Sequence, residues 1–360
     1  MTVRHLRTDA LDPYIRGEEL GRRMAAEIAT NVRDYERLFE AVKVTTADLP
    51  ALGSAAIDQV RAWAPSLVRE WEGLAAGSGL DLWRIGVLNA RTEILATVKA
   101  IGEGECSVAV YAPGQGSPRS VQTWDWHDAF ESERFMVTHS VEGGTRLRYF
   151  TEAGLTGKIG IAARDRGSLG LHLNILHHSS DGDGLGVPVH AVMRRVLECA
   201  DSLESAIDIA RSAAVSASSA LTVVGYEQGR SWAATLEICP DGVAVVPPDE
   251  EGFLVHTNHF IDPTLAEGDL MPESSDTWDR MAVLGRRREL LRSSLVDERF
   301  AFLRRHAADG GAVCCHPNPE LAFEHRWRSL ITIDLDYDQH AVRHVDAGPC
   351  QHDVLGHRTF

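Results

Sequence analysis

The chain changes its hydrophobic period at one point, just before Cys106, and this change limits the folds open to it. Apolar residues recur at spacings of three and four over 18–42 and 57–76, and a further helix is indicated over 81–90, after the candidate N-cap Asp81. From Cys106 onward, short alternating runs are separated by turns rich in glycine and proline. We therefore predict a helical segment, residues 1–105, followed by a strand-rich segment, residues 106–360.

Helices are also expected within the strand-rich segment. We predict two consecutive helices over 190–199 and 203–213, the second with a capping box of Asp201 and Glu204, and a long charged helix over 276–306. The predicted strands are 107–111, 119–126, 135–139, 146–151, 158–162, 169–176, 220–226, 231–238, 242–246, 253–256, 329–336 and 341–345. This order predicts an α+β protein of layered sheets covered by helices, with both segments in one domain.

Charge and hydropathy exclude several classes of partner. The chain has 36 Lys and Arg against 52 Asp and Glu, and its formal charge of −16 would repel nucleic acid and an anionic membrane alike. It has no apolar run of about 18 residues and no apolar segment typical of a signal peptide near its start. We predict a soluble, cytoplasmic protein that binds neither nucleic acid nor membrane; a homo-oligomer is left open.

The cysteines and histidines do not follow a metal or disulfide pattern. The six cysteines lack Cys-x-x-Cys spacing, which argues against a disulfide framework. His172, His177 and His178, with the acidic segment 181–184, could suggest a metal, but no His-x-x-x-His or Cys/His pairing supports a ligand set. We predict no metal site.

Cys106 is the cysteine with the most informative surroundings. A loop of small and acidic residues, 101–105, precedes Cys106, which lies at the start of a predicted strand. We therefore expect Cys106 to be exposed on one side and anchored on the other. Such a cysteine is either a reactive thiol or simply a small apolar residue that opens a strand.

Five segments decide between these alternatives. They are Glu-Gly-Glu-Cys-Ser-Val at 103–108, Gln-Thr-Trp-Asp-Trp at 122–126, Thr-Glu-Ala-Gly-Leu-Thr-Gly-Lys-Ile-Gly at 151–160, Gly-Val-Pro-Val-His at 186–190 and His-Thr-Asn-His at 256–259. In this order the chain resembles, over about residues 10–345, the acyl-coenzyme A:6-aminopenicillanate acyltransferase family of autoproteolytic cysteine enzymes. The resemblance implies an N-terminal-nucleophile hydrolase fold of four layers, αββα, and a precursor that is cut between Glu105 and Cys106. Residues 1–105 would then remain as the partner chain of residues 106–360.

The chemistry of such a cut has a physical reason. A cysteine freed at a new N-terminus carries an α-amine beside its thiol, and this amine, with an ordinary pKa of about 7.7–8, can serve as the general base. Before the cut the nitrogen belongs to an amide and cannot accept the proton.

The resemblance also assigns roles to individual residues. Cys106 would be the nucleophile, Asp125 would hold its amine and thiol, and Asn258 would donate to the oxyanion, where one donor is worth about 3–4 kcal/mol. Arg326, with Arg328 as an alternative, would anchor a carboxylate or stabilise Asp125. Three structural alternatives stay open: Asp125 as a strand-end cap, Asn258 as a turn residue and Arg326 as a solvated charge.

Five residues are predicted to border the substrate pocket: Trp124, Glu152, Ala162, His259 and Arg328. The chain departs from the family pattern at two points. Glu105 stands where the penicillin enzyme has glycine, which leaves the efficiency of the cut open. The segment 161–167 has alanine where the family usually has asparagine, which leaves the substrate open.

These observations predict an autoproteolytically activated cysteine acyltransferase or amidohydrolase. It would act on small N-acyl amides or acyl thioesters through a thioester on Cys106. We expect it to need no cofactor, with acyl-coenzyme A left open as a co-substrate. Two alternatives remain: a metal-dependent hydrolase built on the histidines, and a non-catalytic binding protein of the same fold.

Overall fold

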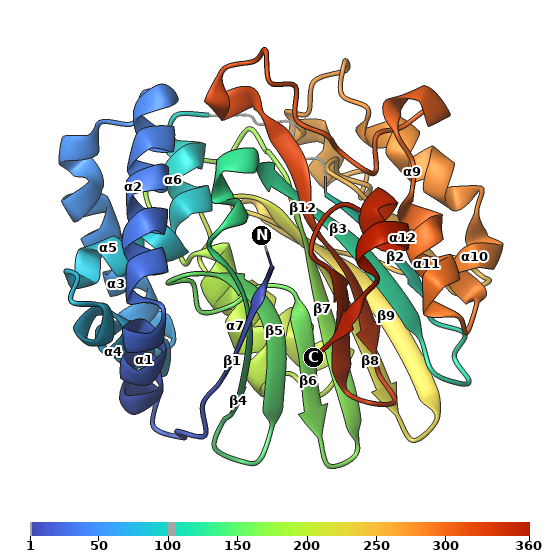
Figure 1. Cartoon of the computed structure of the whole chain (residues 1–360), viewed down its shortest axis with the longest axis horizontal. Coiled ribbons are helices and arrows are strands. Elements are labelled where there is room, and N and C mark those ends of the chain that lie inside the picture. The colour runs from blue at the N-terminus through green and yellow to red at the C-terminus, as the bar shows by residue number, and fades with distance from the viewer. Residues whose placement is uncertain (1, 100–105) are drawn as a thin grey trace.

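Two β-sheets lie face to face in the computed structural model, which describes residues 2–99 and 106–360 (Figure 1). In order across the first sheet, the eight strands are β1 (Arg4–Arg7), β4 (Arg134–Ser140), β5 (Arg146–Glu152), β6 (Gly160–Arg164), β7 (Gly167–Ile175), β8 (Ser219–Glu227), β9 (Arg230–Cys239) and β10 (Gly242–Val246). The six strands of the second sheet are β11 (Phe253–His256), β2 (Ser107–Tyr111), β3 (Arg119–His127), β12 (Trp327–Asp336), β13 (Ala341–Val345) and β14 (Arg358–Thr359).

Helices cover the outer face of each sheet. On the eight-stranded sheet, α7 (Val189–Cys199) packs against β6 and β7, and α8 (Leu203–Ser212) packs against β8, β9 and β10. On the six-stranded sheet the covering helices are α9 (Thr277–Gly285), α10 (Arg288–Arg292) and α11 (Val296–Leu303). Between the sheets, β7 contacts β2, and β13 contacts β5 and β6. The predicted α+β class and its αββα layers are confirmed.

Within the described residues 2–99, six α-helices form a group beside one end of the sheets, coloured blue to cyan in Figure 1. They are α1 (Pro13–Arg23), α2 (Ala25–Ala41), α3 (Leu49–Trp63), α4 (Pro65–Ser78), α5 (Leu82–Asn89) and α6 (Arg91–Thr97). The helix predicted over 57–76 is divided, because a proline disfavours the helical conformation of the residue before it. Ala64 accordingly has φ −143° and ψ 73°, and α4 begins at Pro65.

Two further expectations were wrong, and one strand was not predicted. The long helix over 276–306 is three short ones. The first break includes Arg287, with φ −116° and ψ 23°; at the second, Ser293 turns to ψ 141° and its hydroxyl accepts a hydrogen bond from the Leu295 amide at 3.1 Å. The capping box of α8 is formed by Ser202 and Ser205, not by Asp201 and Glu204. Strand β1, which pairs in parallel with β4, was not predicted from its four residues.

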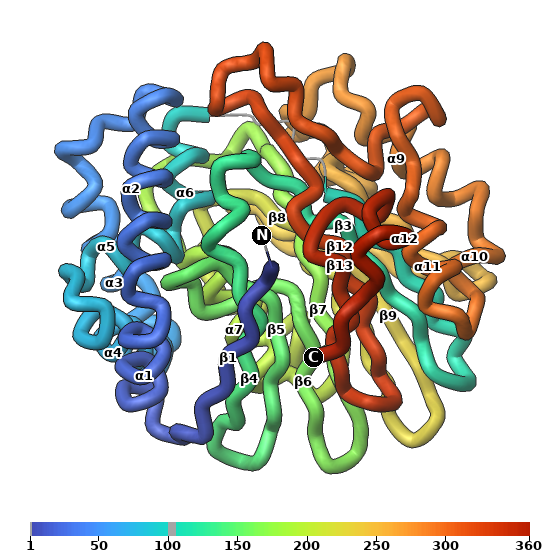
Figure 2. The backbone as a smooth tube through the Cα atoms, in the orientation of Figure 1, coloured from blue at the N-terminus to red at the C-terminus, as the bar shows by residue number. Residues whose placement is uncertain are grey.

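The hydrophobic core is continuous across the position of Cys106. Ile28 and Tyr35 from α2 belong to the same buried cluster as Phe130 and Phe150 from the strand-rich segment. The two ends of the chain also meet, since the Val3 amide donates to Asp346 at 3.1 Å and both ends lie on one face in Figure 2. Residues from 2–99 therefore share one hydrophobic core with the strand-rich segment.

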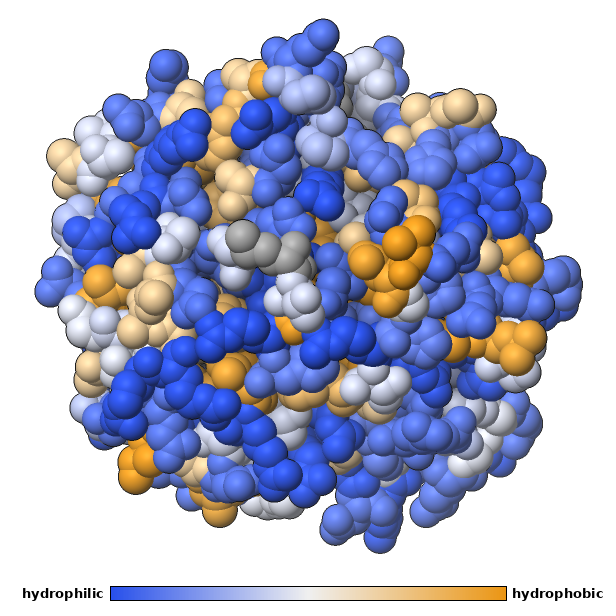
Figure 3. All heavy atoms as spheres, in the orientation of Figure 1, coloured by the Kyte–Doolittle hydropathy of each residue, from blue (hydrophilic) through white to orange (hydrophobic). Residues whose placement is uncertain are grey.

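The visible surface of the protein is largely polar (Figure 3). The face shown in Figure 3 is mostly hydrophilic, with small and scattered hydrophobic patches. None of the helices in the two described ranges is both long and apolar enough to span a lipid bilayer.

Helices α1 and α4 cross with their backbones almost in contact. A Cβ atom on Gly17 would lie 2.1 Å from the carbonyl oxygen of Glu70, and one on Gly73 would lie 2.1 Å from that of Tyr14. Only glycine fits at such a crossing, because any side chain would force the helices apart. The crossing brings the side chains of Arg16 and Glu70 together.

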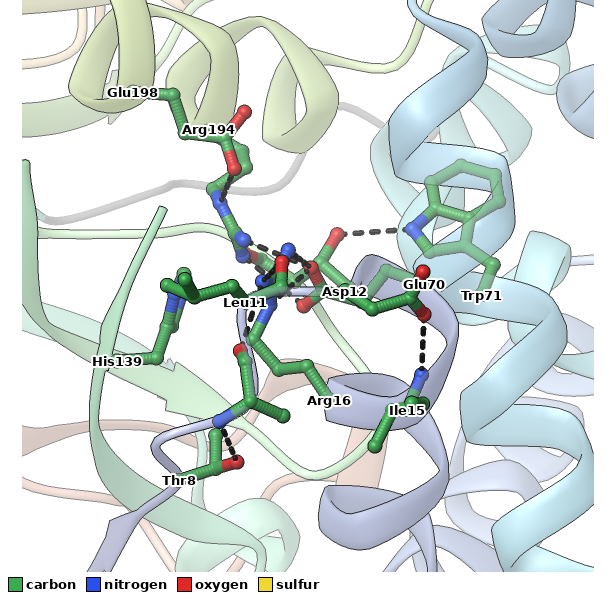
Figure 4. Close-up of polar contacts among 12 residues, drawn as sticks. Thr8, Leu11, Asp12, Ile15, Arg16, Glu70, Trp71, His139, Arg194 and Glu198 are labelled. Atoms are coloured by element: carbon green, nitrogen blue, oxygen red, sulfur yellow. Dashed lines mark hydrogen bonds and ion pairs between the residues drawn. The ribbon is translucent and has the colours of Figure 1, made fainter. Parts of the chain in front are cut away.

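Glu70 is the centre of a buried ionic cluster that joins these helices to the sandwich (Figure 4). Its carboxylate binds Arg16 of α1 at 2.7 Å and Arg194 of α7 at 2.8 Å, and each of the three side chains is at most 3% exposed. Arg194 also donates to the Thr156 carbonyl at 2.6 Å. Burial by itself would raise the pKa of Glu70, but Arg194 and Arg16 outweigh it and lower the pKa to about 2.

Replacing Glu70 with alanine should lower the free energy of unfolding by about 3–5 kcal/mol, because two buried guanidinium groups lose their counter-ion. Urea denaturation followed by circular dichroism measures this loss. Glu72→Ala, on the same helix but in an exposed pair with Arg69, is the control and should cost less than about 1 kcal/mol. Because the folded pKa is lowered, the stabilisation by Glu70 should be present above the ordinary carboxyl pKa and be lost as pH falls toward 2. Equal losses in both variants would contradict this role.

Candidate active site

Cys106 immediately precedes β2, the strand that lies between β11 and β3. Its Sγ accepts a hydrogen bond from the Asp125 amide at 3.5 Å and lies 3.7 Å from the Asp125 carbonyl oxygen. The residue is only 5% exposed, so the expectation of a cysteine exposed on one side is wrong. Pairing of β2 with β3 explains this position, since Ser107 lies opposite Thr123 and Cys106 therefore lies beside the next two residues of β3.

The thiol of Cys106 is held in its protonated form. Burial, and then the carboxylate of Asp125, raises the pKa of the thiol to about 12, and the cations Lys158 and Arg280 offset this only in part. Because the thiolate is the nucleophile, the intact chain contains a thiol of low reactivity.

Asn258 reaches the same place from the segment after β11. Its Nδ2 donates to the Ile175 carbonyl at 2.9 Å, and its Oδ1 accepts a hydrogen bond from Arg280 of α9 at 3.1 Å. Arg280 also donates to the Cys106 carbonyl at 3.1 Å, as does Asn174 of β7 at 2.8 Å. Arg280 therefore fixes which way the Asn258 amide faces and links it to the backbone of Cys106.

A small pocket lies between Cys106, Asp125 and Asn258. Its remaining walls are Arg91, Trp124, Trp126, Leu173 and Ile175. Two of these residues, Trp126 and Ile175, also line a cavity of about 530 Å³. Most of its other lining side chains are apolar, among them Leu38, Val42, Leu95, Ala96, Leu176 and Ala217. The thiol thus lies beside a space that can hold a sizeable apolar group.

Two buried cations stand behind the tryptophans of this pocket. The Lys158 ammonium lies 3.4 Å from the centre of the Trp124 ring, and the Arg91 guanidinium lies 4.3 Å from that of Trp126. Both cations pair with the fully buried Glu152, and Arg91 does so at 2.9 Å. Burial lowers the pKa of Lys158 to about 7 even though Glu152 opposes the shift.

Comparison with known proteins assigns the chain to a family. Residues 113–297, just over half of the chain, match the family described as "Acyl-coenzyme A:6-aminopenicillanic acid acyl-transferase". The chain belongs to this family. A relative from Emericella nidulans, "Acyl-coenzyme A:6-aminopenicillanic-acid-acyltransferase 40 kDa form", is 28% identical over 220 residues, which are 60% of this chain and 58% of the relative. The chain therefore spans less than two thirds of that relative's length.

Two solved structures are also similar to the chain. The N-acylethanolamine-hydrolyzing acid amidase ortholog of Caenorhabditis elegans has a TM-score of 0.43 and 16% identity, covering 64% of this chain and 92% of its own. A mutant of conjugated bile acid hydrolase from Clostridium perfringens has a TM-score of 0.42 and 11% identity, covering 71% and 92% respectively.

The residues that the family resemblance assigned do not all meet. Cys106, Asp125, Asn258 and the predicted pocket residue Trp124 line one pocket. Arg326 is not among the described residues that line it; it pairs with Asp128 at 3.3 Å. Arg328 pairs with Glu131 at 2.9 Å, and both arginine side chains are about one-third exposed, at 30% and 34%. The roles suggested for these arginines gain no geometric support.

Glu152, His259 and Ala162 are not among the described residues that line the pocket beside the thiol. Glu152 pairs with Lys158 and Arg91, the two cations behind the tryptophans of the pocket. His259 forms a hydrogen bond with Thr277 at 3.0 Å and packs on Trp278. Ala162 is buried within β6, between its partners Leu147 and Leu169. Glu105, the residue before the predicted cut, lies outside the described residues.

The histidines proposed for a metal hydrolase are dispersed. His172 uses Nδ1 to contact Gln122 at 3.1 Å and Nε2 to contact Ser120 at 2.8 Å, between the two sheets. The His178 ring instead contacts Ser180 at 2.7 Å. Within residues 2–99 and 106–360, the groups close enough to share a metal lie elsewhere and include none of these histidines.

Sequence reasoning missed the cations of the site. Lys158 lies in the segment 151–160, among glycines and apolar residues. A lysine in such surroundings indicates a buried charge that is paired. Arg91 and Arg280 lie in helices whose patterns look amphipathic, and nothing local to either distinguishes them from surface arginines.

In the uncut chain, Asp125→Asn should increase the alkylation rate of Cys106 by roughly threefold or more near pH 9, because removing the carboxylate lowers the thiol pKa and each unit of pKa changes the thiolate fraction about tenfold. Arg280→Met should act in the opposite direction, because the Arg280 guanidinium lowers the thiol pKa. Pulse alkylation and mass spectrometry of the tryptic peptide 100–119 report the uncut chain alone, with the exposed Cys199 as internal reference. Identical rate–pH curves in all three proteins would show that these charges do not act on Cys106.

Proposed function

We propose that the protein is an autoproteolytically activated enzyme that transfers acyl groups from small N-acyl amides or acyl thioesters through a thioester on Cys106. The observation that carries this proposal is the position of the Cys106 thiol between Asp125 and Asn258, beside a cavity of about 530 Å³. Membership of a family named for acyl transfer gives it independent support. We infer the chemistry from the residues as follows.

The first step requires activation of the thiol. With its pKa raised to about 12, the thiol of the intact chain is a weak nucleophile. A cut before Cys106 would add an α-amine beside the thiol, and its ordinary pKa of about 7.7–8 suits it to accept the thiol proton near neutral pH. The backbone and carboxylate of Asp125 are close enough to hold both groups in position.

The second step requires stabilisation of the oxyanion. One N–H of the Asn258 amide is used by the Ile175 carbonyl, which leaves the second N–H for an oxygen in the pocket. Arg280 accounts for the orientation of this amide by donating to its oxygen. The thiolate would attack the acyl carbon, the amine or thiol of the substrate would leave with a proton, and a thioester would remain on Cys106.

The larger cavity suggests where the acyl group of the substrate would lie. An apolar acyl chain would lie in the larger cavity, among Leu38, Leu95 and Leu176. The acceptor of the acyl group would decide the outcome: water gives hydrolysis and an amine gives transfer. Acyl-coenzyme A, named in the family description and the name of the relative, is a thioester donor of this type.

Purified protein should contain two chains, residues 1–105 and 106–360, of about 11 and 28 kDa. They should co-elute on gel filtration, because the core and the Glu152 and Glu70 clusters join them. Cys106→Ala should remain a single chain, whereas Cys239→Ala, at another buried cysteine, should be cut normally. Intact-mass analysis measures both. An uncut wild-type protein that still hydrolyses amides would contradict the autoproteolytic part of the proposal.

Ala96→Phe should shorten the acyl groups that the enzyme accepts, because it places a ring in the larger cavity, whose described lining includes Ala96 but not Cys106. The ratio of kcat/KM for N-octanoyl over N-acetyl anilides should fall by about tenfold or more. Ala26→Phe, at an exposed alanine of α2, is the control and should leave the ratio unchanged. Equal loss on both substrates would indicate general damage, and no change would place the acyl group elsewhere.

A further inference from the structure

Two cysteines and two histidines from distant parts of the chain meet beyond the end of α11. His306 follows this helix, Cys314 and His316 lie in the loop that leads to β12, and Cys350 lies in a short turn near the C-terminus. Their ligand atoms all lie within 4.8 Å of one another. Figure 1 shows α11 beside the C-terminal helix α12 (His352–Leu355), and the Cys350 turn contacts both.

The distances match those of a tetrahedral zinc site. The Nε2 atom of His316 lies 3.6 Å from the Sγ atom of Cys314 and 3.5 Å from that of Cys350. For Zn²⁺ with Zn–S of about 2.3 Å and Zn–N of about 2.0–2.1 Å, two ligands of a tetrahedron are separated by roughly 3.5–3.6 Å. The rings of His306 and His316 are 5.2 Å apart between centroids, and the ligand atom of His306 lies within 4.8 Å of the other three.

We propose that His306, Cys314, His316 and Cys350 bind a structural Zn²⁺ ion. The set offers two thiolates and two imidazoles, the ligand types that select zinc over magnesium or calcium, which prefer oxygen. All four positions come from the protein, so none remains for water or substrate, and the site is structural rather than catalytic. Binding converts both thiols to thiolates and releases about two protons to solvent.

Such an ion would hold a loop that supports the candidate active site. Next to Cys314, the Cys315 amide donates to the Ser329 hydroxyl at 2.9 Å, and the Ser329 amide donates to the Cys315 carbonyl at 3.0 Å. Ser329 of β12 lies directly opposite Asp125 of β3 in the ladder. The zinc ion would thus tie the loop and the C-terminal turn to the strand that carries the partner of Asp125.

The test measures the number of zinc ions per chain in untagged protein. The protein is produced in cells grown with zinc and is purified under reducing conditions without chelator. Elemental analysis by mass spectrometry should find about one Zn²⁺ per chain. Cys314→Ser and Cys350→Ser should each lower this to about 0.2 or less, while the exposed-cysteine control Cys199→Ser should retain it. Cobalt-loaded wild-type protein should show the intense visible bands of a tetrahedral site with thiolate charge transfer, and Cys314→Ser should lose them.

A second readout is independent of activity. Removal of zinc with a chelator should lower the melting temperature of the wild-type protein but leave that of Cys314→Ser unchanged. The proposal is overturned if the reduced wild-type protein holds no zinc, or if zinc persists in both cysteine variants. It is also overturned if zinc is lost in His357→Ala, which would assign the ion to the neighbouring group Asp297, His352 and His357. A disulfide between Cys314 and Cys350 in the protein as isolated would overturn it as well.

Discussion

One buried carboxylate, that of Glu152 at the end of β5, joins the N-terminal helices to the sheets and to the candidate active site. It accepts a hydrogen bond from Tyr35 of α2 at 2.6 Å and one from Arg91 of α6 at 2.9 Å, and it pairs with Lys158. Burial opposes its charge, but Arg91 and Lys158 outweigh burial and lower the pKa of Glu152 to about 2. A buried ion of this kind is tolerated only when several donors surround it, so the N-terminal helices must dock where they do.

The same carboxylate shapes the surroundings of the thiol. By holding Arg91 and Lys158 it keeps two cations against Trp126 and Trp124, the aromatic walls of the pocket beside Cys106. Of these two cations, Lys158 acts on the thiol, and together with Arg280 it partly offsets the effect of Asp125 on the thiol pKa. If the chain is cut before Cys106, as we propose, the two products still share this cluster, because Arg91 and Tyr35 precede the cut and Glu152 and Lys158 follow it.

Local patterns predicted most of the fold, and their failures have a common cause. The alternation of residues 107–111 and 119–126 marked the two strands that position Cys106, because pleat and burial impose that period on neighbours in sequence. Failures came where a short feature outweighed the pattern: Pro65 divided one helix, and Ser293 ended another. Strand β1 escaped prediction because its place is set by pairing with β4, well over a hundred residues away.

The change of period at Cys106, most helices and strands and the family could be inferred from the sequence, because they depend on the identity and period of adjacent residues. The charges that surround the thiol became known only from the folded chain. Folding brought Arg280, 174 residues away, to the Cys106 carbonyl, directed Arg326 toward Asp128, and gathered His306, Cys314, His316 and Cys350. None of these contacts has a local signature, since each depends on where packing and strand pairing place residues that are far apart in the chain.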